Sequence, residues 1–298
     1  MHTPLSQYLR ERREFVEAAL HRYLVADAAM PPRLAEAMRY SVLAGGKRLR
    51  PILVLAGAEA VGGTAERVLP CACAMEMIHV FSLIHDDLPA MDDDDLRRGQ
   101  PTNHKVFGEA MAILAGDGLL AEAFWCLTDP ALVASVEASV LLAVLREIAA
   151  ATGGRGMVGG QVLDMEAEHR TLSAAEVTAL HAGKTGALIT AAVTAGAQLA
   201  GGSAEAIDAV RCYGNAIGLA FQIADDLLAI EGTEAELGKR IGNDAQREKA
   251  TYPAMVGVEA ARRRMQELTA EAVAAVAVFG ERGWVLRDIA EYVTTRRS

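Results

Sequence analysis

Two pairs of adjacent aspartates are the residues of this sequence best suited to chemistry. Asp86 and Asp87 begin an acidic run that resumes at residues 92–95, and Asp225 and Asp226 form a second pair much further along the chain. Each pair follows an apolar stretch, and carboxylates at the end of a buried helix are costly unless cations neutralise them. Mg²⁺ prefers oxygen ligands and shares its remaining positions with substrate phosphates. The two pairs therefore predict a magnesium site for a phosphorylated substrate.

The spacing within each cluster decides which side chains can act together. Asp86 and Asp92 are six residues apart and would lie on different sides of an ideal helix, but a bulge at Pro89 could bring both to one face. In the second cluster, Gln222 precedes Asp225 by three residues and so shares a helix face with it. The first run lacks the glycine and terminal glutamate spacing of an EF-hand loop. Taken alone, it would also fit a solvated acidic loop.

Basic residues accompany both aspartate pairs. The segment GGKRLRP (45–51) places Lys47 and Arg50 three residues apart, directly after two glycines that let the backbone turn. The other candidates are Arg97, Arg98, Lys184 and Lys239. Each alone would suit an ordinary surface charge, but the set exceeds what one diphosphate requires, and arginine grips phosphate bidentately. We expect two anionic ligands, one bound through metal ions and one mainly through basic side chains.

The elements that position these residues are expected to be helices. The chain is 52% hydrophobic but only 5% aromatic, and its apolar content is mostly the strong helix formers Ala and Leu. No convincing alternating run predicts a strand. Gly and Pro punctuation predicts helices near residues 4–26, 32–44, 51–61, 65–89, 108–128, 130–152, 156–168, 173–200, 204–230, 252–279 and 283–295. So many long helices with several apolar faces predict an all-α bundle.

Charge, cysteine content and hydropathy exclude several classes of protein. The net charge is −10 and no basic stripe offsets it, which argues against a nucleic-acid partner. None of the four cysteines has a zinc-site spacing, so we expect buried, reduced thiols. The N-terminus does not resemble a signal peptide, and the longest apolar stretches fall short of a membrane span. The expected location is cytoplasmic.

The motifs resemble those of the short-chain trans-prenyl diphosphate synthases, particularly the bacterial farnesyl diphosphate synthases. The resemblance extends from about Tyr40 to Pro253. Its motifs are GGKRLRP (45–51), SLIHDDLPAMDDDDLRRGQPTNH (82–104), GGQ (159–161), KTGAL (184–188), FQIADD (221–226) and the LGK to TYP region (237–253). It implies an isoprenoid-synthase-type helix bundle around a central apolar cavity, in a single polyprenyl synthase domain over residues 1–298. It also implies a homodimer.

The same resemblance implies a role for each candidate residue. The catalytic set would be Asp86, Asp87, Asp92, Lys184, Thr185, Gln222 and Asp225. About three Mg²⁺ ions, for which Mn²⁺ could substitute, would be held by Asp86 and Asp92 with Asp87 in support, and by Asp225 with Asp226. Isopentenyl diphosphate would contact Lys47, Arg50, His79 and Arg98, and the allylic diphosphate would contact Arg97, Lys184 and Lys239. Gln222 and Thr185 would line the reacting centre.

The implied reaction is a head-to-tail condensation of isopentenyl diphosphate with dimethylallyl or geranyl diphosphate. Metal ions would help the allylic diphosphate to leave, and the isopentenyl double bond would attack the carbocation. Phe81, with its neighbour Ser82, is the predicted limit on chain length, because it lies five residues before Asp86 and about 7–8 Å deeper along the helix. We expect farnesyl diphosphate as the product. The simpler interpretation, that Phe81 only packs the core, stays open.

One departure from the family pattern bears on the alternatives. The second motif is usually DDxxD, but here Ala229 stands in place of its last aspartate, so we expect a weakened third metal. Geranyl or geranylgeranyl diphosphate remains an alternative product, and the preferred allylic starter stays open. A non-catalytic partner subunit of a heteromeric synthase is a further alternative, favoured by Ala229. The second-motif pattern of terpene cyclases is absent, because position 229 is Ala and position 233 is Thr.

Overall fold

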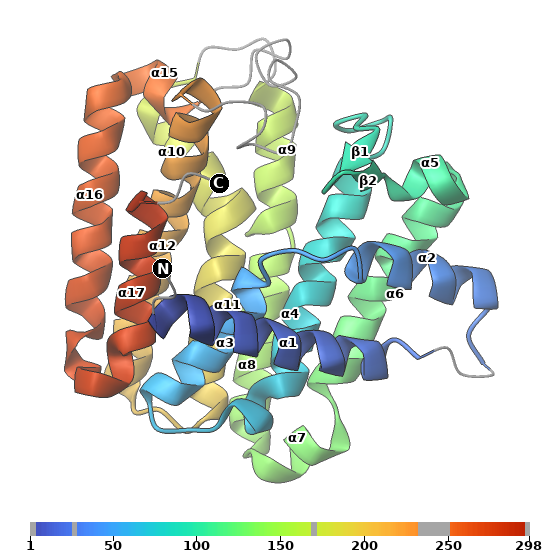
Figure 1. Ribbon diagram of the computed structural model, residues 1–298, viewed down its shortest axis with the longest axis horizontal. Helices are drawn as coiled ribbons and strands as arrows, with labels where there is room; N and C mark the ends of the chain where they lie inside the picture. The colour runs from blue at the N-terminus through green and yellow to red at the C-terminus, as the bar shows by residue number, and fades with distance from the viewer. Residues whose placement is uncertain (1–3, 26–28, 168–171, 232–250, 296–298) are drawn as a thin grey trace. The chain divides into compact units, whose positions relative to one another are not determined.

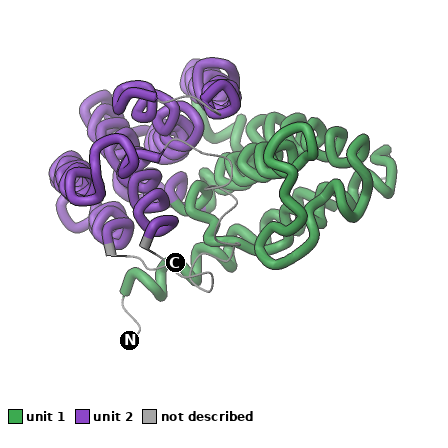
Figure 2. Tube along the Cα trace, turned by 90° about the horizontal axis from the view of Figure 1, so that it is seen from above, with its two compact units in different colours: residues 1–52, 66–137 green, residues 53–65, 138–298 purple. Residues whose placement is uncertain are grey.

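The computed structural model describes residues 4–25, 29–167, 172–231 and 251–295 (Figure 1). The chain divides into two compact units, residues 1–52 with 66–137 and residues 53–65 with 138–298 (Figure 2). The described residues are almost entirely helical, which confirms the predicted all-α class. The single synthase domain over residues 1–298 and the central apolar cavity stay predictions.

The first unit contains six helices and a short hairpin among its described residues. The helices are α1 (Pro4–Tyr23), α2 (Pro32–Val42), α4 (Ala65–Asp86), α5 (Asn103–Phe107), α6 (Glu109–Leu127) and α7 (Pro130–Ser135). The hairpin pairs β1 (Leu96–Arg97) with β2 (Gln100–Pro101) in antiparallel register. The sequence pattern did not predict this hairpin, because strands of two residues are too short to alternate.

Helix α4 carries the first aspartate pair at its end. Its central residues, among them Met75, Met77 and Ile78, are fully buried, as expected of a helix that is apolar on every side. The helix ends at Asp86 rather than near residue 89, because Pro89 disfavours helical backbone at the residue before it. A buried helix thus ends in a half-buried carboxylate, that of Asp86.

Two stretches of the first unit are long and apolar enough, by length and composition, to cross a membrane. From the sequence alone, every apolar stretch was expected to be too short for a span. The two stretches are Ala65–Asp86 and Glu109–Ser135. Such stretches are weak evidence of a span, because a core helix of a soluble protein has the same composition. The apolar window of Ala65–Asp86 is 78% buried and that of Glu109–Ser135 is 39% buried. The first stretch is therefore a core helix, while the second leaves apolar side chains exposed.

The second unit contains the second aspartate pair. It includes most of α3 (Leu49–Ala60), followed by α8 (Ala138–Thr152), α9 (Met157–Ala167), α10 (Ala174–His181), the π-helix η1 (Ala182–Gly186), α11 (Ala187–Leu199), α12 (Ala204–Glu231), α15 (Tyr252–Val256), α16 (Val258–Ala275), the 3₁₀ segment η2 (Val276–Gly283) and α17 (Trp284–Thr295). Helix α11 packs against α8 and α12, and nearly all of its side chains are buried.

Three predicted helices are interrupted in the structure. The helix expected over 130–152 divides into α7 and α8, because Val136 has extended backbone. The helix expected over 252–279 divides at Gly257, whose φ of 84° is left-handed. The helix expected over 173–200 contains η1, which lies at the KTG motif. π-Helical turns of this kind are often found at functional sites.

Candidate active site

A tight turn brings the first acidic run together after α4. The backbone N–H of Asp92 donates to the carbonyl of Asp86 at 2.7 Å, and that of Asp93 donates to Leu88 at 3.0 Å. Asp93 adopts a left-handed φ of 47° to close the turn. The predicted helical bulge is therefore wrong, and a turn instead joins the backbones of Asp86 and Asp92. Both of these aspartates are half-buried.

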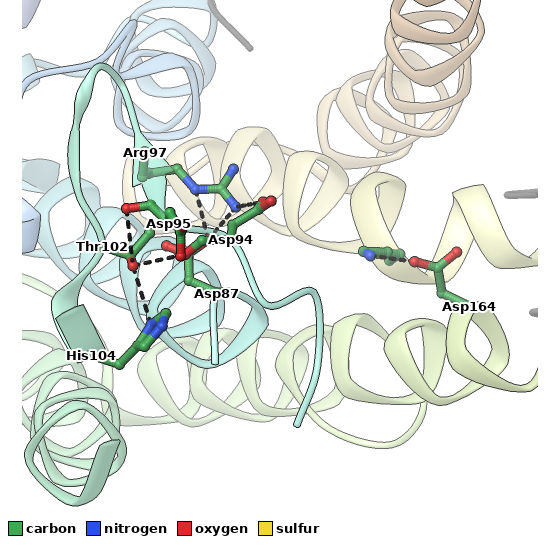
Figure 3. Close-up of polar contacts among 8 residues, drawn as sticks. Asp87, Asp94, Asp95, Arg97, Thr102, His104 and Asp164 are labelled. Carbon is green, nitrogen blue, oxygen red and sulfur yellow. Dashed lines mark hydrogen bonds and ion pairs between the residues drawn. The ribbon is translucent and has the colours of Figure 1, made fainter. Parts of the chain in front are cut away.

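Asp87 is paired with Arg97 of the hairpin. Its side chain is buried, and its Oδ1 accepts hydrogen bonds from Nε of Arg97 at 2.9 Å and from a second guanidinium nitrogen (Figure 3). Asp94 accepts a longer bond from the same guanidinium at 3.4 Å. Burial alone would lower the pKa of Arg97, but the contacts with Asp87 and Asp94 outweigh it and raise that pKa. Arg97 is thus a permanently charged group in a defined orientation.

The hairpin is held in place by Thr102. Its hydroxyl donates to the carbonyl of Asp94 at 2.8 Å, and its backbone N–H donates to the carbonyl of Asp95 at 3.0 Å. The hydroxyl also lies 3.2 Å from Nδ1 of the buried His104 (Figure 3). These bonds close the chain after the acidic run and hold β1, which carries Arg97 and leads directly into Arg98, beside the end of α4.

Arg98 connects the hairpin to the GGKRLRP segment. Its guanidinium donates to the carbonyl of Gly45, and its own backbone is left-handed, with a φ of 55°. A Cβ at Gly46 would lie 2.7 Å from Cζ of Arg98, so a larger residue there would displace the guanidinium from this position. The glycines predicted to let the backbone turn therefore also admit Arg98, which brings it to the segment containing Lys47 and Arg50.

Four arginines, here called the arginine cluster, lie near enough to His79 of α4 for their charges to affect its pKa. Burial lowers the pKa of His79 well below its ordinary value, and the positive charges of Arg50, Arg98, Arg97 and Arg48 lower it further, in that order. His79 is therefore neutral at physiological pH, among several arginines. The structure brings together the residues predicted to bind isopentenyl diphosphate, apart from Lys47, which is exposed on the same segment. Concentrated positive charge of this kind suits a diphosphate.

Arg48 has a structural role that the sequence did not suggest. It is buried, with a left-handed φ of 51°, and its guanidinium bonds to Glu76 of α4 at 2.7 Å and to the carbonyl of Val42 at 2.7 Å. Glu17 of α1 lies 3.5 Å from its Nε. Arg48 thus ties the segment to these helices. Its neighbours Lys47 and Arg50 are the residues of this segment that are predicted to bind a ligand.

The two residues predicted to limit chain length lie on α4 near this cluster. Phe81 is buried and makes an edge contact with the ring of His85 at 4.9 Å between centroids. The hydroxyl of Ser82 donates to the carbonyl of His79 at 2.8 Å. A pocket of the first unit is lined by Val80, Leu83, Ile84, Asp87, Arg97 and Arg98, among others, and Phe81 is not one of its lining residues. The role of Phe81 in chain length stays a prediction.

In the second unit, Asp226 and Gln222 form a hydrogen-bonded network on α12. Nε2 of Gln222 donates to Oδ1 of Asp226 at 3.1 Å, and the hydroxyl of Thr185 donates to Oε1 of Gln222 at 2.9 Å. The backbone N–H of Tyr252 donates to Oδ2 of Asp226 at 2.8 Å. The structure therefore joins Thr185, Gln222 and Asp226, and it adds Tyr252 at the start of α15. Asp225 is half-buried on the same helix.

Lys184 of η1 is oriented by a carboxylate that the sequence analysis overlooked. Its Nζ donates to Oδ2 of Asp164 on α9 at 2.6 Å (Figure 3). Asp164 follows the GGQ motif by three residues, and that spacing could have identified it. His181 precedes η1, lies 3.6 Å from Asp226, and has a pKa lowered to about 4, chiefly by burial. It is therefore neutral near pH 7.

The carboxylates suit Mg²⁺ as a partner of phosphate rather than as the centre of a protein cage. Within the described ranges, no three His, Cys, Asp or Glu side chains gather closely enough to hold a metal ion. Mg²⁺ is commonly bound by one or two carboxylates, several waters and substrate phosphates, so it needs no such cluster. Asp86, Asp92 and Asp225, half-buried carboxylates, fit that donor set. Lys239, a further predicted ligand, lies outside the described residues.

The helical fold, the carboxylates that suit Mg²⁺ and the arginine cluster define a class of protein, the helical enzymes that act on diphosphates. The family model described as polyprenyl synthetase matches residues 31–279, and the chain belongs to that family. Its members use Mg²⁺ and transfer prenyl groups, so the predicted prenyltransferase activity is confirmed.

Relatives of known name share most of the chain. A farnesyl diphosphate synthase of Bacillus subtilis is 48% identical over 265 residues, which are 89% of each chain. A geranylgeranyl diphosphate synthase of Cyanophora paradoxa is 45% identical over 99% of this chain and 97% of its own. The crystal structure of an FPP/GFPP synthase from Zymomonas mobilis superposes with a TM-score of 0.87 at 40% identity, covering 97% of this chain and 98% of that one.

Proposed function

We propose that this protein condenses isopentenyl diphosphate with dimethylallyl or geranyl diphosphate, head to tail, to give farnesyl diphosphate. The observation that carries the proposal is the arginine cluster around His79, directly beside the Asp87–Arg97 pair and the turn that joins Asp86 to Asp92. Fixed cations next to acidic metal ligands suit two diphosphates bound in different ways. The names of the relatives support the same reaction.

Asp86 and Asp92 are the proposed ligands of two Mg²⁺ ions, and Asp225 that of a third, with Mn²⁺ as a substitute. Asp87 and Asp226 support these ligands. When bound, the ions would neutralise the allylic diphosphate and favour its departure. This assignment of metal ligands is supported by the resemblance of the motifs and by the carboxylate chemistry of the half-buried positions.

Each basic residue has a proposed substrate. Lys47, Arg50, His79 and Arg98 bind isopentenyl diphosphate, and Arg97, Lys184 and Lys239 bind the allylic diphosphate. Arg97 and Lys184 are held in place by Asp87 and Asp164 respectively, which orients them before substrate arrives. Preorganised cations stabilise negative charge without reorganising during the reaction.

In the proposed reaction, the isopentenyl unit supplies electrons and the departing diphosphate takes them up. The allylic C–O bond breaks with its electron pair on the departing diphosphate, and the isopentenyl double bond supplies the electrons of the new C–C bond. One proton is then lost from the isopentenyl unit, and the departing diphosphate is the proposed acceptor. Apolar surroundings that exclude water would protect the carbocation. Gln222 and Thr185 line this centre in the proposal.

A homodimer in the cytoplasm, with no nucleic-acid partner, completes the proposal. Exposed apolar side chains on α6 support a second copy as the partner, because Trp125 is 75% exposed and Ile113 and Leu114 lie exposed on the same helix. Large apolar groups gathered on one helix commonly mark an interface between protein chains. Light scattering of the purified protein tests the oligomeric state.

The experiment that tests the reaction uses the purified protein, Mg²⁺ and labelled isopentenyl diphosphate with each allylic starter in turn. We expect a fifteen-carbon product from both starters, and none after addition of EDTA. A ten- or twenty-carbon product would support the chemistry but contradict the product length. No product from either this protein or Ala229→Asp would favour the non-catalytic partner subunit.

A further inference from the structure

His85, in the last turn of α4, connects this helix to α6. Its Nε2 lies 3.0 Å from the backbone carbonyl oxygen of Ile113. A carbonyl oxygen only accepts hydrogen bonds, so Nε2 carries a hydrogen and donates it. Oδ1 of Asp117 lies 4.0 Å from the same nitrogen. Ile113 and Asp117 belong to one turn of α6, so the half-buried imidazole is directed at that turn.

Gly116 provides the space that the imidazole occupies on α6. A Cβ at this buried position would lie 2.2 Å from Nε2 of His85 and 2.5 Å from its Cδ2. Any larger residue would therefore displace the ring. Glycine inside a helix costs about 1 kcal/mol relative to alanine, and the imidazole gives this glycine a packing reason. We call this space the Gly116 notch.

The imidazole of His85 also contacts the ring of Phe81. The two residues are four apart on α4 and are therefore neighbours on one face of the helix. Their ring centroids lie 4.9 Å apart and their planes are inclined by 79°, an edge-to-face arrangement that aromatic pairs prefer. Phe81 is itself buried. A ring that α6 holds in place is thus packed against the phenyl ring.

We propose that His85 is a positioning residue that holds the ring of Phe81 across the path of the growing prenyl chain. The Gly116 notch and the Ile113 carbonyl fix the imidazole, and the imidazole restricts the phenyl ring. Product length then depends on the contact between α4 and α6 as well as on the size of residue 81. This inference rests on the proposed function and on the chain-length role proposed for Phe81.

Two allylic starters separate this role from a general loss of activity. His85 precedes Asp86, so a substitution there also disturbs the end of α4 and slows the reaction with every starter. The ratio of the initial rates with farnesyl and with geranyl diphosphate cancels this common loss, because both starters use the same diphosphate site. Displacement of the phenyl ring changes the ratio, since in the proposal only the longer starter reaches residue 81.

The test measures this ratio for the purified protein with Mg²⁺ and labelled isopentenyl diphosphate. For His85→Ala we expect the ratio to rise about 3–10-fold, which is what the loss of one aromatic contact amounts to as a rate ratio. His85→Gln keeps an N–H donor for the Ile113 carbonyl but removes the ring. Its ratio should rise as much as that of His85→Ala, whereas a purely structural role of the hydrogen bond would leave it unchanged.

The Gly116 notch is tested on α6. Gly116→Ala displaces the imidazole and should also raise the ratio about 3–10-fold. In the His85→Ala background the same change should alter the ratio less than about twofold, because no ring remains to be displaced. Gly118→Ala is the matched control on the same helix. Its Cβ would first meet the flexible end of the Met38 side chain, at 3.0 Å, so we expect an unchanged ratio.

A final comparison asks whether His85 acts through Phe81. In the Phe81→Ala background, His85→Ala should change the ratio less than about twofold, because no phenyl ring remains to be held. An unchanged ratio in an active His85→Ala variant, or an unchanged ratio in His85→Gln, would overturn the proposal and leave the proposed function intact. If the unmodified protein forms no prenyl product from geranyl diphosphate, the proposed function fails, and this inference fails with it.

Discussion

Adjacent aspartates in this protein differ in burial, because a helix turns by about 100° from one residue to the next. Asp87 and Asp226 turn inward to donors of the same unit, whereas Asp86 and Asp225 are half-buried. The type of residue predicts a charge at each position. Its environment decides how deeply that charge is buried.

Ala229 leads to a prediction about the strength of metal binding. Helix α12 continues to Glu231, so position 229 lies one turn after Asp225 on the same face. We expect Ala229→Asp to lower the Mg²⁺ concentration for half-maximal activity by about tenfold, because a further carboxylate joins the acidic face. Initial rates over a Mg²⁺ titration measure this. Ala229→Asn controls for size, and an equal gain from it would contradict the electrostatic explanation.

Phe81 leads to a prediction about the product. If its ring limits elongation, Phe81→Ala should shift the product from fifteen to twenty carbons or more, and chromatography of the dephosphorylated products would show it. The substitution also removes the contact with His85, so we expect a loss of about 3 kcal/mol in the free energy of unfolding. Phe81→Tyr keeps a ring and should keep fifteen carbons. An unchanged product from Phe81→Ala would mean that the ring only packs the core.

At the scale of elements, close packing of helices positions the KTG motif. A Cβ at Gly160 of α9 would overlap the backbone of Lys184 in η1, so glycine is needed where the two elements meet. On the other side, a Cβ at Gly218 of α12 would lie 2.7 Å from Cα of Gly186. The π-helix is therefore held between α9 and α12, and this holds Lys184 and Thr185 beside Asp164 and Gln222.

Gly160→Ala should disturb this packing. We expect the free energy of unfolding to fall by about 1–3 kcal/mol, because the added methyl group meets backbone that cannot rotate away. Gly186→Ala is the matched control, since its Cβ would meet only the His181 carbonyl, at an ordinary 3.6 Å. It should be neutral or stabilising by up to about 1 kcal/mol. Urea unfolding of both variants makes the comparison, and equal losses would contradict it.

The buried ion pair of Arg48 and Glu76 holds the GGKRLRP segment against α4. Glu76→Gln should cost about 3–5 kcal/mol, because it leaves the guanidinium buried without its charged partner. Glu17→Gln is the control, since Glu17 is part-exposed and its pairing distance is 3.5 Å, and it should cost less than about 1 kcal/mol. Denaturant unfolding of the two variants measures both losses. Similar values for the two would indicate that the pair adds little to stability.

At the scale of the whole molecule, cysteine burial corrects one expectation. Cys71, Cys73 and Cys126 are buried, as predicted, but Cys212 is exposed. Burial raises the pKa of Cys71 and of Cys126 to about 12, so neither forms a reactive thiolate near neutral pH. The three buried thiols fit the expectation of small apolar residues, and the exposed Cys212 does not.

The stability of the fold should depend on pH through His79. Its pKa is lowered in the folded protein by burial and by neighbouring arginines, whereas in the unfolded chain it is near 6.5. The unfolded chain therefore binds a proton that the folded protein does not, and the free energy of unfolding falls as the pH drops below about 6.5. Above that pH, His79 contributes no slope.

Urea titrations between about pH 4 and 8 test this dependence. His79→Gln removes the titrating group, and we expect its stability to change less with pH than that of the unmodified protein. His21, an exposed residue of α1, supplies the control His21→Gln, which leaves His79 in place and should therefore keep the slope that His79 produces. An identical slope in the His79 variant would show that its burial does not persist in solution.

The sequence by itself determined the helical class, the family and the residues that carry charge to the site. Ala and Leu content and the absence of alternation required helices, and the two aspartate pairs with their basic companions required a metal–diphosphate chemistry. These conclusions depend on residue type and local spacing, which a linear chain displays directly. The family model and the relatives confirmed the class and the family.

Only the tertiary structure decided which charges are committed to internal partners. Asp164 lies 20 residues from Lys184, and Glu76 lies 28 from Arg48, so neither pairing has a local signal. The turn that joins Asp86 to Asp92 depends on a left-handed residue and on the hairpin beyond it, which no periodicity predicts. Burial depends on packing between distant segments, and burial is what separates Asp87 from Asp86 and Asp226 from Asp225.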